Sequence, residues 1–135
     1  MRSFTLIELI IVIIIIGILV TFAMPAFMVT QEKALTKEAI ANLKLIAAAE
    51  KVYRMNNAFY YPKPCPPTEG DIIDINNYLK LYFTDETNWD YAITVATAGA
   101  FTATAQRTGG SYPSCKYTID QSTAEPTVVS STTCP

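Results

Sequence analysis

The stretch from Phe4 to Pro25, FTLIELIIVIIIIGILVTFAMP, decides the fold of this 135-residue chain. Glu8 is its one charged side chain, and residues 9–30 carry no charge at all. A helix of about 20 apolar residues crosses the hydrocarbon core of a bilayer, so this stretch predicts a membrane-spanning helix. A carboxylate inside such a helix is costly and is usually functional, which makes Glu8 the first candidate functional residue.

The helical pattern continues beyond the apolar stretch. From Gln31 to about Asn57, apolar side chains recur every three or four residues and alanine is abundant, which predicts an amphipathic helix. Lysines and other polar side chains form its opposite face. We place Glu50 and Arg54 there, at the i and i+4 spacing that favours an ion pair. Joined together, the two stretches predict one helix of about 50 residues.

The remainder of the chain predicts a small sheet. Four prolines between Tyr60 and Gly70 exclude a helix there, and residues 71–83 then show helical spacing with Asp71 as the expected N-cap. Candidate strands follow at residues 91–97, 101–105, 115–119 and 127–129. We therefore expect an α+β fold, in which a long N-terminal helix packs on an antiparallel sheet of three or four strands. The first half of that helix is hydrophobic and the second half is amphipathic.

Composition excludes several classes of function. The net charge is −2 and there is no basic run, so the sequence has no feature of a nucleic-acid-binding protein. Histidine is absent, which removes the commonest general base and metal ligand. The carboxylates between Thr84 and Asp90 lack the spacing of a calcium loop. We find no convergent nucleophile and base, and we expect no enzyme activity, no cofactor and no metal site.

The N-terminus resembles a known processing signal. Residues 3–9, SFTLIEL, followed by the apolar run, are similar to the N-terminus of type IV pilins and type II secretion pseudopilins. In that family a prepilin peptidase cuts before the Phe, and the new N-terminus is methylated. The resemblance implies cleavage between Ser3 and Phe4 and an N-methylated Phe4. The family usually has glycine where this chain has Ser3, and its leaders are usually longer and more basic than residues 1–3.

The resemblance also implies an assembly mechanism. In the family, the carboxylate at the position of Glu8 attracts the freed amine of a neighbouring subunit, which here is the amine of Phe4. Gly17 and Pro25 stand where the family often has residues that loosen the helix, and we expect a kink at Pro25. The implied partners are identical or related subunits in a helical polymer, the prepilin peptidase and assembly machinery, and membrane lipid before assembly.

Whether the three cysteines form disulfides depends on the compartment in which the domain lies. An exported domain meets oxidising conditions, in which cysteines tend to pair. Cys115 and Cys134 lie close together near the C-terminus, and many pilins carry a disulfide loop there, so we expect this pair and an unpaired Cys65. The sequence alone also allows Cys65 to pair with either of the other two.

These expectations divide the chain into five parts. They are a leader at residues 1–3, a transmembrane and filament-core helix at 4–30, the amphipathic half of the same helix at 31–58, a connection with a short helix at 59–90, and the sheet with its disulfide loop at 91–135.

Three functions are compatible with this sequence. The first is a structural subunit of a type IV pilus, inserted in the bacterial cytoplasmic membrane with its head outside and then assembled into an extracellular filament for adhesion or motility. The second is a pseudopilin of a type II secretion system. The third is a membrane-anchored binding protein that does not assemble. Two rival interpretations of the N-terminus itself are a plain single-pass anchor and a secretory signal peptide.

Orientation in the membrane rests on two conflicting observations. Lys33, Lys37 and Lys44 follow the span, whereas Arg2 alone precedes it, so the positive-inside rule places the C-terminal part in the cytoplasm. The family resemblance and the cysteines place it outside. We follow the resemblance.

Overall fold

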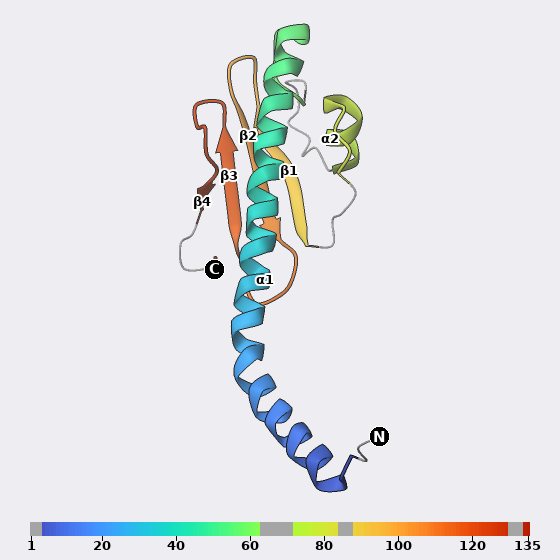
Figure 1. The fold of residues 1–135 in the computed structure, drawn as a ribbon. Coiled ribbons are helices and arrows are strands. Elements are labelled where there is room, and N and C mark those ends of the chain that lie inside the picture. Colours follow the sequence, from blue (N-terminus) through green and yellow to red (C-terminus); the bar gives the residue numbers. More distant parts are fainter. Residues whose placement is uncertain (1–3, 63–71, 84–87, 130–133) are drawn as a thin grey trace.

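The computed structural model describes residues 4–62, 72–83, 88–129 and 134–135. This described part contains two helices, α1 (Leu6–Asn57) and α2 (Ile72–Leu79). It also contains the strands β1 (Trp89–Ala96), β2 (Phe101–Arg107), β3 (Lys116–Asp120) and β4 (Thr127–Val128). Figure 1 shows α1 running the length of the molecule, with its upper half against the sheet and its lower half projecting beyond it. The predicted α+β fold, a long helix packed on a small antiparallel sheet, is confirmed.

α1 is one continuous helix with a cap at each end. It has 52 residues, which corresponds to about 78 Å. Thr5 is its N-cap, and at the other end Ala58 adopts a left-handed conformation from which its N–H donates to the carbonyl of Arg54 at 2.8 Å. The helix continues through Pro25. In place of the expected local kink, Figure 1 shows a gradual curve over the lower half.

The sheet is an antiparallel meander in the order β1-β2-β3-β4 within the described residues. Its first strand begins at Trp89 rather than at the predicted residue 91, and the register shifts between Ile93 and Val95. α2 ends at Leu79, earlier than predicted, and its expected N-cap Asp71 lies outside the described residues.

The core lies between the amphipathic half of α1 and one face of the sheet. Alternate residues of β2 point toward the helix, and because Ala103 and Ala105 are small, α1 can approach the strand closely. α2 closes one side of this core. The buried side chains include Ala39, Leu43 and Ile46 of α1, Ile72, Ile75 and Leu79 of α2, Trp89, Tyr91 and Ile93 of β1, and Tyr117 and Ile119 of β3.

The position of Glu50 contradicts the prediction that this residue belongs to the polar face of α1. Its side chain is 0% exposed, and its Oε2 accepts the N–H of Tyr61 at 2.9 Å. Arg54 is exposed and donates instead to the hydroxyl of Tyr60 at 3.2 Å. The predicted ion pair between Glu50 and Arg54 was wrong, because Glu50 lies seven residues after Leu43 and so continues the buried face of the helix.

A disulfide joins Cys115 and Cys134, whose Cα atoms lie 4.7 Å apart. It ties the end of the chain to the residue before β3 and closes a loop with a sequence separation of 19. A loop of this size restricts the unfolded chain enough to stabilise the fold by about 3 kcal/mol. The expectation that Cys65 is unpaired falls on a residue outside the described ranges.

Candidate functional site

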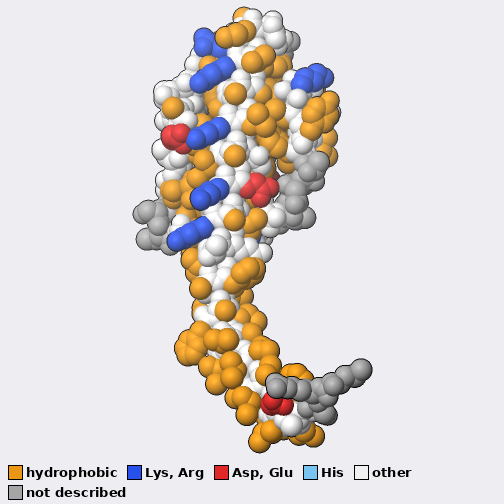
Figure 2. All heavy atoms as spheres, viewed as in Figure 1, with side chains coloured by type: hydrophobic (Ala, Val, Ile, Leu, Met, Phe, Trp, Pro, Cys, Tyr) orange, Lys and Arg blue, Asp and Glu red, His pale blue; other side chains and the backbone are white. Residues whose placement is uncertain are grey.

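The apolar segment, which we define as residues 6–30, lacks a packing partner within the described chain. Every residue of this segment is exposed. Figure 2 shows hydrophobic side chains over this part of the molecule, and α1 is long and apolar enough to cross a membrane by length and composition. An exposed apolar surface of this extent marks a membrane or protein contact, so the segment requires lipid or other subunits around it.

Three residues inside the apolar segment affect its backbone. Pro25 has no N–H, so the carbonyl of Thr21 loses its usual helical partner. The hydroxyl of Thr21 donates to the carbonyl of Gly17 at 2.8 Å. A Cβ added at Gly17 would meet nothing within 4 Å, so packing within the chain does not explain this glycine. The loosening of the helix between Gly17 and Pro25 stays a prediction.

Glu8 is engaged within its own chain. Its Oε2 accepts hydrogen bonds from the backbone N–H of Thr5 at 2.9 Å and from the Thr5 hydroxyl at 2.7 Å, and the Thr5 Oγ1 accepts the N–H of Glu8 at 3.4 Å. This reciprocal pair is a capping box. The sequence analysis assigned Glu8 to a neighbouring amine and missed Thr5, although a threonine three residues before a glutamate is the usual signal. Phe4 is described and exposed, whereas Ser3 and the predicted cleavage lie outside the described residues.

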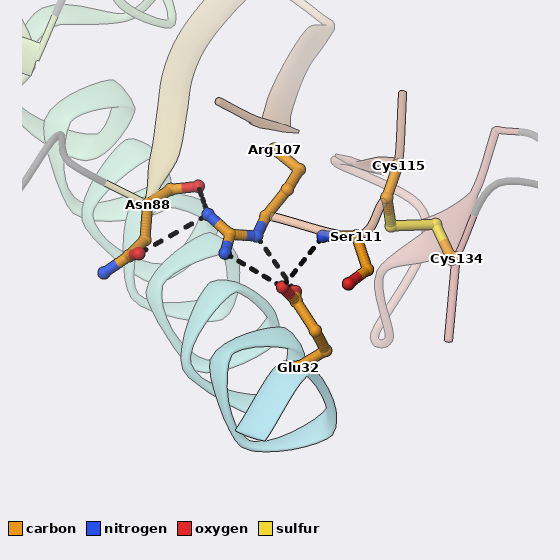
Figure 3. A network of polar contacts seen from close by, with 6 residues as sticks. All are labelled: Glu32, Asn88, Arg107, Ser111, Cys115 and Cys134. Atoms are coloured by element: carbon orange, nitrogen blue, oxygen red, sulfur yellow. Dashed lines mark hydrogen bonds and ion pairs between the residues drawn. A yellow bond between two sulfur atoms is a disulfide. The ribbon is translucent and has the colours of Figure 1, made fainter. Parts of the chain in front are cut away.

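A second group of polar residues lies where α1 enters the head, which we define as residues 58–135. Figure 3 shows this group, the Glu32 network, formed by Glu32, Asn88, Arg107 and Ser111. Arg107 Nε lies 3.1 Å from Glu32 Oε2, and Arg107 Nη2 donates to Glu32 Oε1 at 3.3 Å. Arg107 Nη1 also donates to the carbonyl of Asn88 at 2.6 Å, and the N–H of Ser111 donates to Glu32 Oε1 at 3.3 Å.

The Glu32 network is a buried and well-paired ion pair. The side chains of Arg107 and Glu32 are only 6% and 11% exposed. The hydrogen bond from Arg107 lowers the pKa of the Glu32 carboxyl, with a smaller contribution from the N–H of Ser111, against the opposing effect of burial. The Glu32 carboxyl is therefore charged at neutral pH, and the pair fixes the head on the helix rather than presenting a reactive group.

The sequence analysis missed this network, although the sequence holds a signal for each partner. Glu32 lies seven residues before the buried Ala39, on the same helical face. Arg107 follows the inward-pointing Phe101, Ala103 and Ala105 at the spacing of two that keeps side chains on one face of a strand.

The space around Gly110 shows how tightly the Glu32 network is packed. Its φ is +74°, and a Cβ at this position would overlap the carboxylate of Glu32 and the guanidinium of Arg107. We expect Gly110→Ala to destabilise the head by about 2 kcal/mol, from backbone strain and displacement of the ion pair. Thermal unfolding of the detergent-solubilised chain measures this loss. Gly109→Ala is the matched control, since a Cβ there meets nothing within 4 Å, and an equal loss in both variants would contradict the argument.

Metal binding has no support among the residues that the structure describes. They contain no group of three or more His, Cys, Asp or Glu side chains that could hold an ion. The Glu32 network has one carboxylate, which is already neutralised by Arg107.

Comparison with known proteins gives a consistent set of relatives. The model of the prokaryotic N-terminal methylation motif matches residues 1–24. The chain is 26% identical to type II secretion system core protein G of Klebsiella michiganensis, over 68% of this chain and 72% of that protein. It is 41% identical to core protein G of Pseudomonas aeruginosa, over 44% and 42% of the two chains. It is 48% identical to the type IV major pilin protein PilA of Myxococcus xanthus, over 38% of this chain and 24% of PilA.

The chain thus spans most of one of these relatives and less than half of the other two. The chain carries the N-terminal methylation motif and is similar, in its long helix on an antiparallel sheet and in its sequence, to type II secretion core proteins G and to a type IV major pilin.

Proposed function

We propose that this chain is a structural subunit of a helical filament assembled from the cytoplasmic membrane, and that the filament belongs to a type II secretion system. The observation that carries the proposal is the apolar segment, which is exposed along its length while the amphipathic half of α1 is packed into the head. Such a helix is stable in lipid as a monomer and in a bundle of its own kind as a polymer. The role is structural and not catalytic.

Most of the matching relatives are type II secretion system core proteins G, and they favour the secretion filament over the pilus that the sequence analysis placed first. A type IV pilus subunit is the second candidate. It is favoured by the likeness to PilA and by the Cys115–Cys134 disulfide, which matches the C-terminal loop expected from the pilin resemblance.

Processing and assembly are connected in this proposal. Cleavage between Ser3 and Phe4 creates an amine directly before the capping box of Thr5 and Glu8. In the bilayer the Thr5 groups satisfy the Glu8 carboxylate. In the filament the carboxylate then pairs with the methylated Phe4 amine of the adjacent subunit, in surroundings of low dielectric where an unpaired charge is costly.

Glu8→Ala is expected to leave the protein in the membrane at normal abundance but to abolish its recovery in filaments. The reason is that the neighbouring Phe4 amine would be buried without a counter-charge. Immunoblots of membrane and sheared-filament fractions from the native cells measure both quantities. Glu38→Ala, which removes an exposed carboxylate from the amphipathic half, is the matched control. A wild-type filament yield from Glu8→Ala would contradict the proposed assembly mechanism and would favour a membrane-anchored binding protein.

Deletion of the gene in the native cells separates the two candidate machines. A secretion filament predicts that exoproteins accumulate in the periplasm, with surface pili unaffected, and that the wild-type gene restores secretion. A pilus subunit predicts the loss of surface filaments with normal secretion. The intact mass of the filament protein shows whether the chain begins at an N-methylated Phe4. This measurement tests processing in the same material.

A further inference from the structure

Two lysines lie on α1 directly after the apolar segment. Lys33 and Lys37, which we call the basal lysine pair, are both exposed. At 3.6 residues per turn they differ by about 40° around the helix axis, so they lie on one flank of α1 on consecutive turns. Figure 2 shows a row of basic side chains along α1 that ends where the hydrophobic surface of the lower half begins. The basal pair therefore stands at the boundary between head and apolar segment.

The basal pair lacks a counter-charge within the described part of the chain. Neither lysine makes an ion pair or a hydrogen bond there, whereas Lys44, farther along the same flank, pairs with Glu125 at 2.6 Å. The nearest exposed carboxylate in the sequence, Glu38, lies about 100° around the axis from Lys37. Two like charges one turn apart repel each other and destabilise the helix slightly. An anion held between the two ammonium groups would remove this repulsion.

The height of the basal pair on α1 corresponds to the polar layer of a bilayer. Lys33 lies 25 residues after Glu8, which is about 38 Å of helix. A bilayer with its headgroup layers is about 40–45 Å thick, so Glu8 in one polar layer places Lys33 in the other. Lys37 follows about 6 Å above Lys33. Because helical side chains lean toward the N-terminus of their helix, both ammonium groups reach back toward the membrane.

The helix surface below the basal pair can accommodate acyl chains. Phe22 and Ala26 are exposed and lie within about 20° of Lys33 around the axis, two to three turns closer to the N-terminus. The small side chain of Ala26 leaves space between the lysines and the ring of Phe22. A cationic pair above an apolar surface on the same flank matches the two parts of a phospholipid, a charged headgroup above its acyl chains.

We propose that Lys33 and Lys37 bind the headgroup phosphate of an anionic phospholipid, in the leaflet next to the head, while the subunit is in the membrane. The occupant is a lipid because the basal pair continues directly from the apolar segment, and an anionic headgroup supplies the missing counter-charge. The contact is the same whichever side of the membrane holds the head. It fixes the depth and rotation of α1 before assembly, and a subunit breaks it on entering the filament. This inference rests on the membrane stage of the proposed function.

Native mass spectrometry of the full-length chain, released from nanodiscs that contain equal amounts of phosphatidylglycerol and phosphatidylcholine, tests this site. The wild type is expected to retain phosphatidylglycerol over phosphatidylcholine by about fivefold or more, since one lysine near an anionic surface strengthens binding by about that factor. The double variant Lys33→Gln, Lys37→Gln is expected to retain the two lipids about equally.

Two further variants separate the site from general effects of charge. Lys44→Gln, Lys51→Gln is the matched control, because it removes the same charge from the same flank farther from the membrane, and it is expected to keep the wild-type preference. Lys33→Arg, Lys37→Arg keeps the charge at the site and is expected to keep the preference as well. Thermal unfolding at the wild-type temperature shows that each variant is folded.

The possible outcomes separate this proposal from the proposed function. Equal retention of the two lipids by the wild type, or an unchanged preference in Lys33→Gln, Lys37→Gln, would overturn the lipid site. An unchanged preference combined with a loss of filaments in the native cells would assign the basal pair to a neighbouring subunit. A wild-type chain that does not enter nanodiscs would overturn the membrane stage of the proposed function, and this site with it. Normal lipid preference without filaments in the native cells would support the site and overturn the filament.

Discussion

Arg107→Ala is expected to lower the free energy of unfolding of the head by about 3 kcal/mol, which is the usual loss when one partner of a buried ion pair is removed. The variant leaves the Glu32 carboxylate in a site from which water is largely excluded, with the N–H of Ser111 as its remaining described donor. Chemical denaturation of the detergent-solubilised chain measures the loss. Trp89 is the one tryptophan of the chain, and its ring centroid lies 5.9 Å from the Arg107 guanidinium, so its fluorescence reports unfolding at this site.

A surface ion pair provides the matched control for Arg107. Lys44→Ala breaks the pair with Glu125, whose side chains are 43% and 72% exposed. Exposed pairs are worth ~1 kcal/mol at most, so this variant should unfold nearly as the wild type does. The double variant Glu32→Leu, Arg107→Met should recover most of the loss, because it leaves no buried charge. Equal effects from Arg107→Ala and Lys44→Ala would contradict the buried pair.

The pH dependence of this pair follows from the pKa of Glu32. That pKa lies below its ordinary value of 4.5, so the folded state holds the carboxylate charged more strongly than the unfolded chain does. The stabilisation is therefore complete above pH 4.5 and is lost as the pH falls through the lowered pKa. Arg107→Ala should remove this acid-dependent part of the unfolding curve.

Glu50 is expected to give the head the opposite pH dependence. Burial raises the pKa of its carboxyl from 4.5 to about 8, and the hydrogen bond from the N–H of Tyr61 opposes this only in part. The folded chain thus holds a proton that the unfolded chain releases. The contribution of Glu50 to stability is complete below pH 4.5 and is lost as the pH rises through its folded-state pKa of about 8. A shift of this size corresponds to a loss on the order of 5 kcal/mol.

Glu50→Gln tests the effect of the proton separately from the effect of shape. The amide cannot ionise and can still accept the N–H of Tyr61, so the variant should show a nearly flat stability between pH 5.5 and 8 and exceed the wild type at pH 9. The chain has no histidine, which leaves this range free of the side chain that usually titrates there. Parallel stability curves for wild type and Glu50→Gln would rule out a buried proton at this position.

Much of the fold could be predicted from the sequence because its signals are local. Residues that are neighbours in the sequence are enough to recognise these signals by their type and spacing. The signals are the apolar stretch, the alternation of residues 101–105 and the positions of the turns. The long helix and the antiparallel sheet were predicted on this basis and are confirmed.

The two buried carboxylates could not be predicted in the same way. A charged side chain is normally expected at the surface, so the residue type argues against a core position even where the spacing indicates one. Glu50 was assigned to the polar face by its polarity and Glu32 was not singled out, whereas their helical positions place both on the buried face. What makes burial possible is a distant partner: Arg107 is 75 residues from Glu32, and the Tyr61 amide is 11 residues from Glu50. Spacing could have indicated their face, but only the folded chain shows the groups that satisfy them.

The place where α1 enters the head also determines how the molecule responds to a pull. Buried positions on α1 begin at Glu32, so tension along the apolar segment reaches the head first at the ion pair with Arg107. Figure 1 shows the strands running alongside the upper half of α1. A pull along the helix axis therefore slides the helix past the sheet and strains many contacts together, instead of peeling them apart one by one. A chain built in this way resists a pull on its apolar segment with many contacts at once, so its head stays folded under a load that would peel apart contacts broken one at a time.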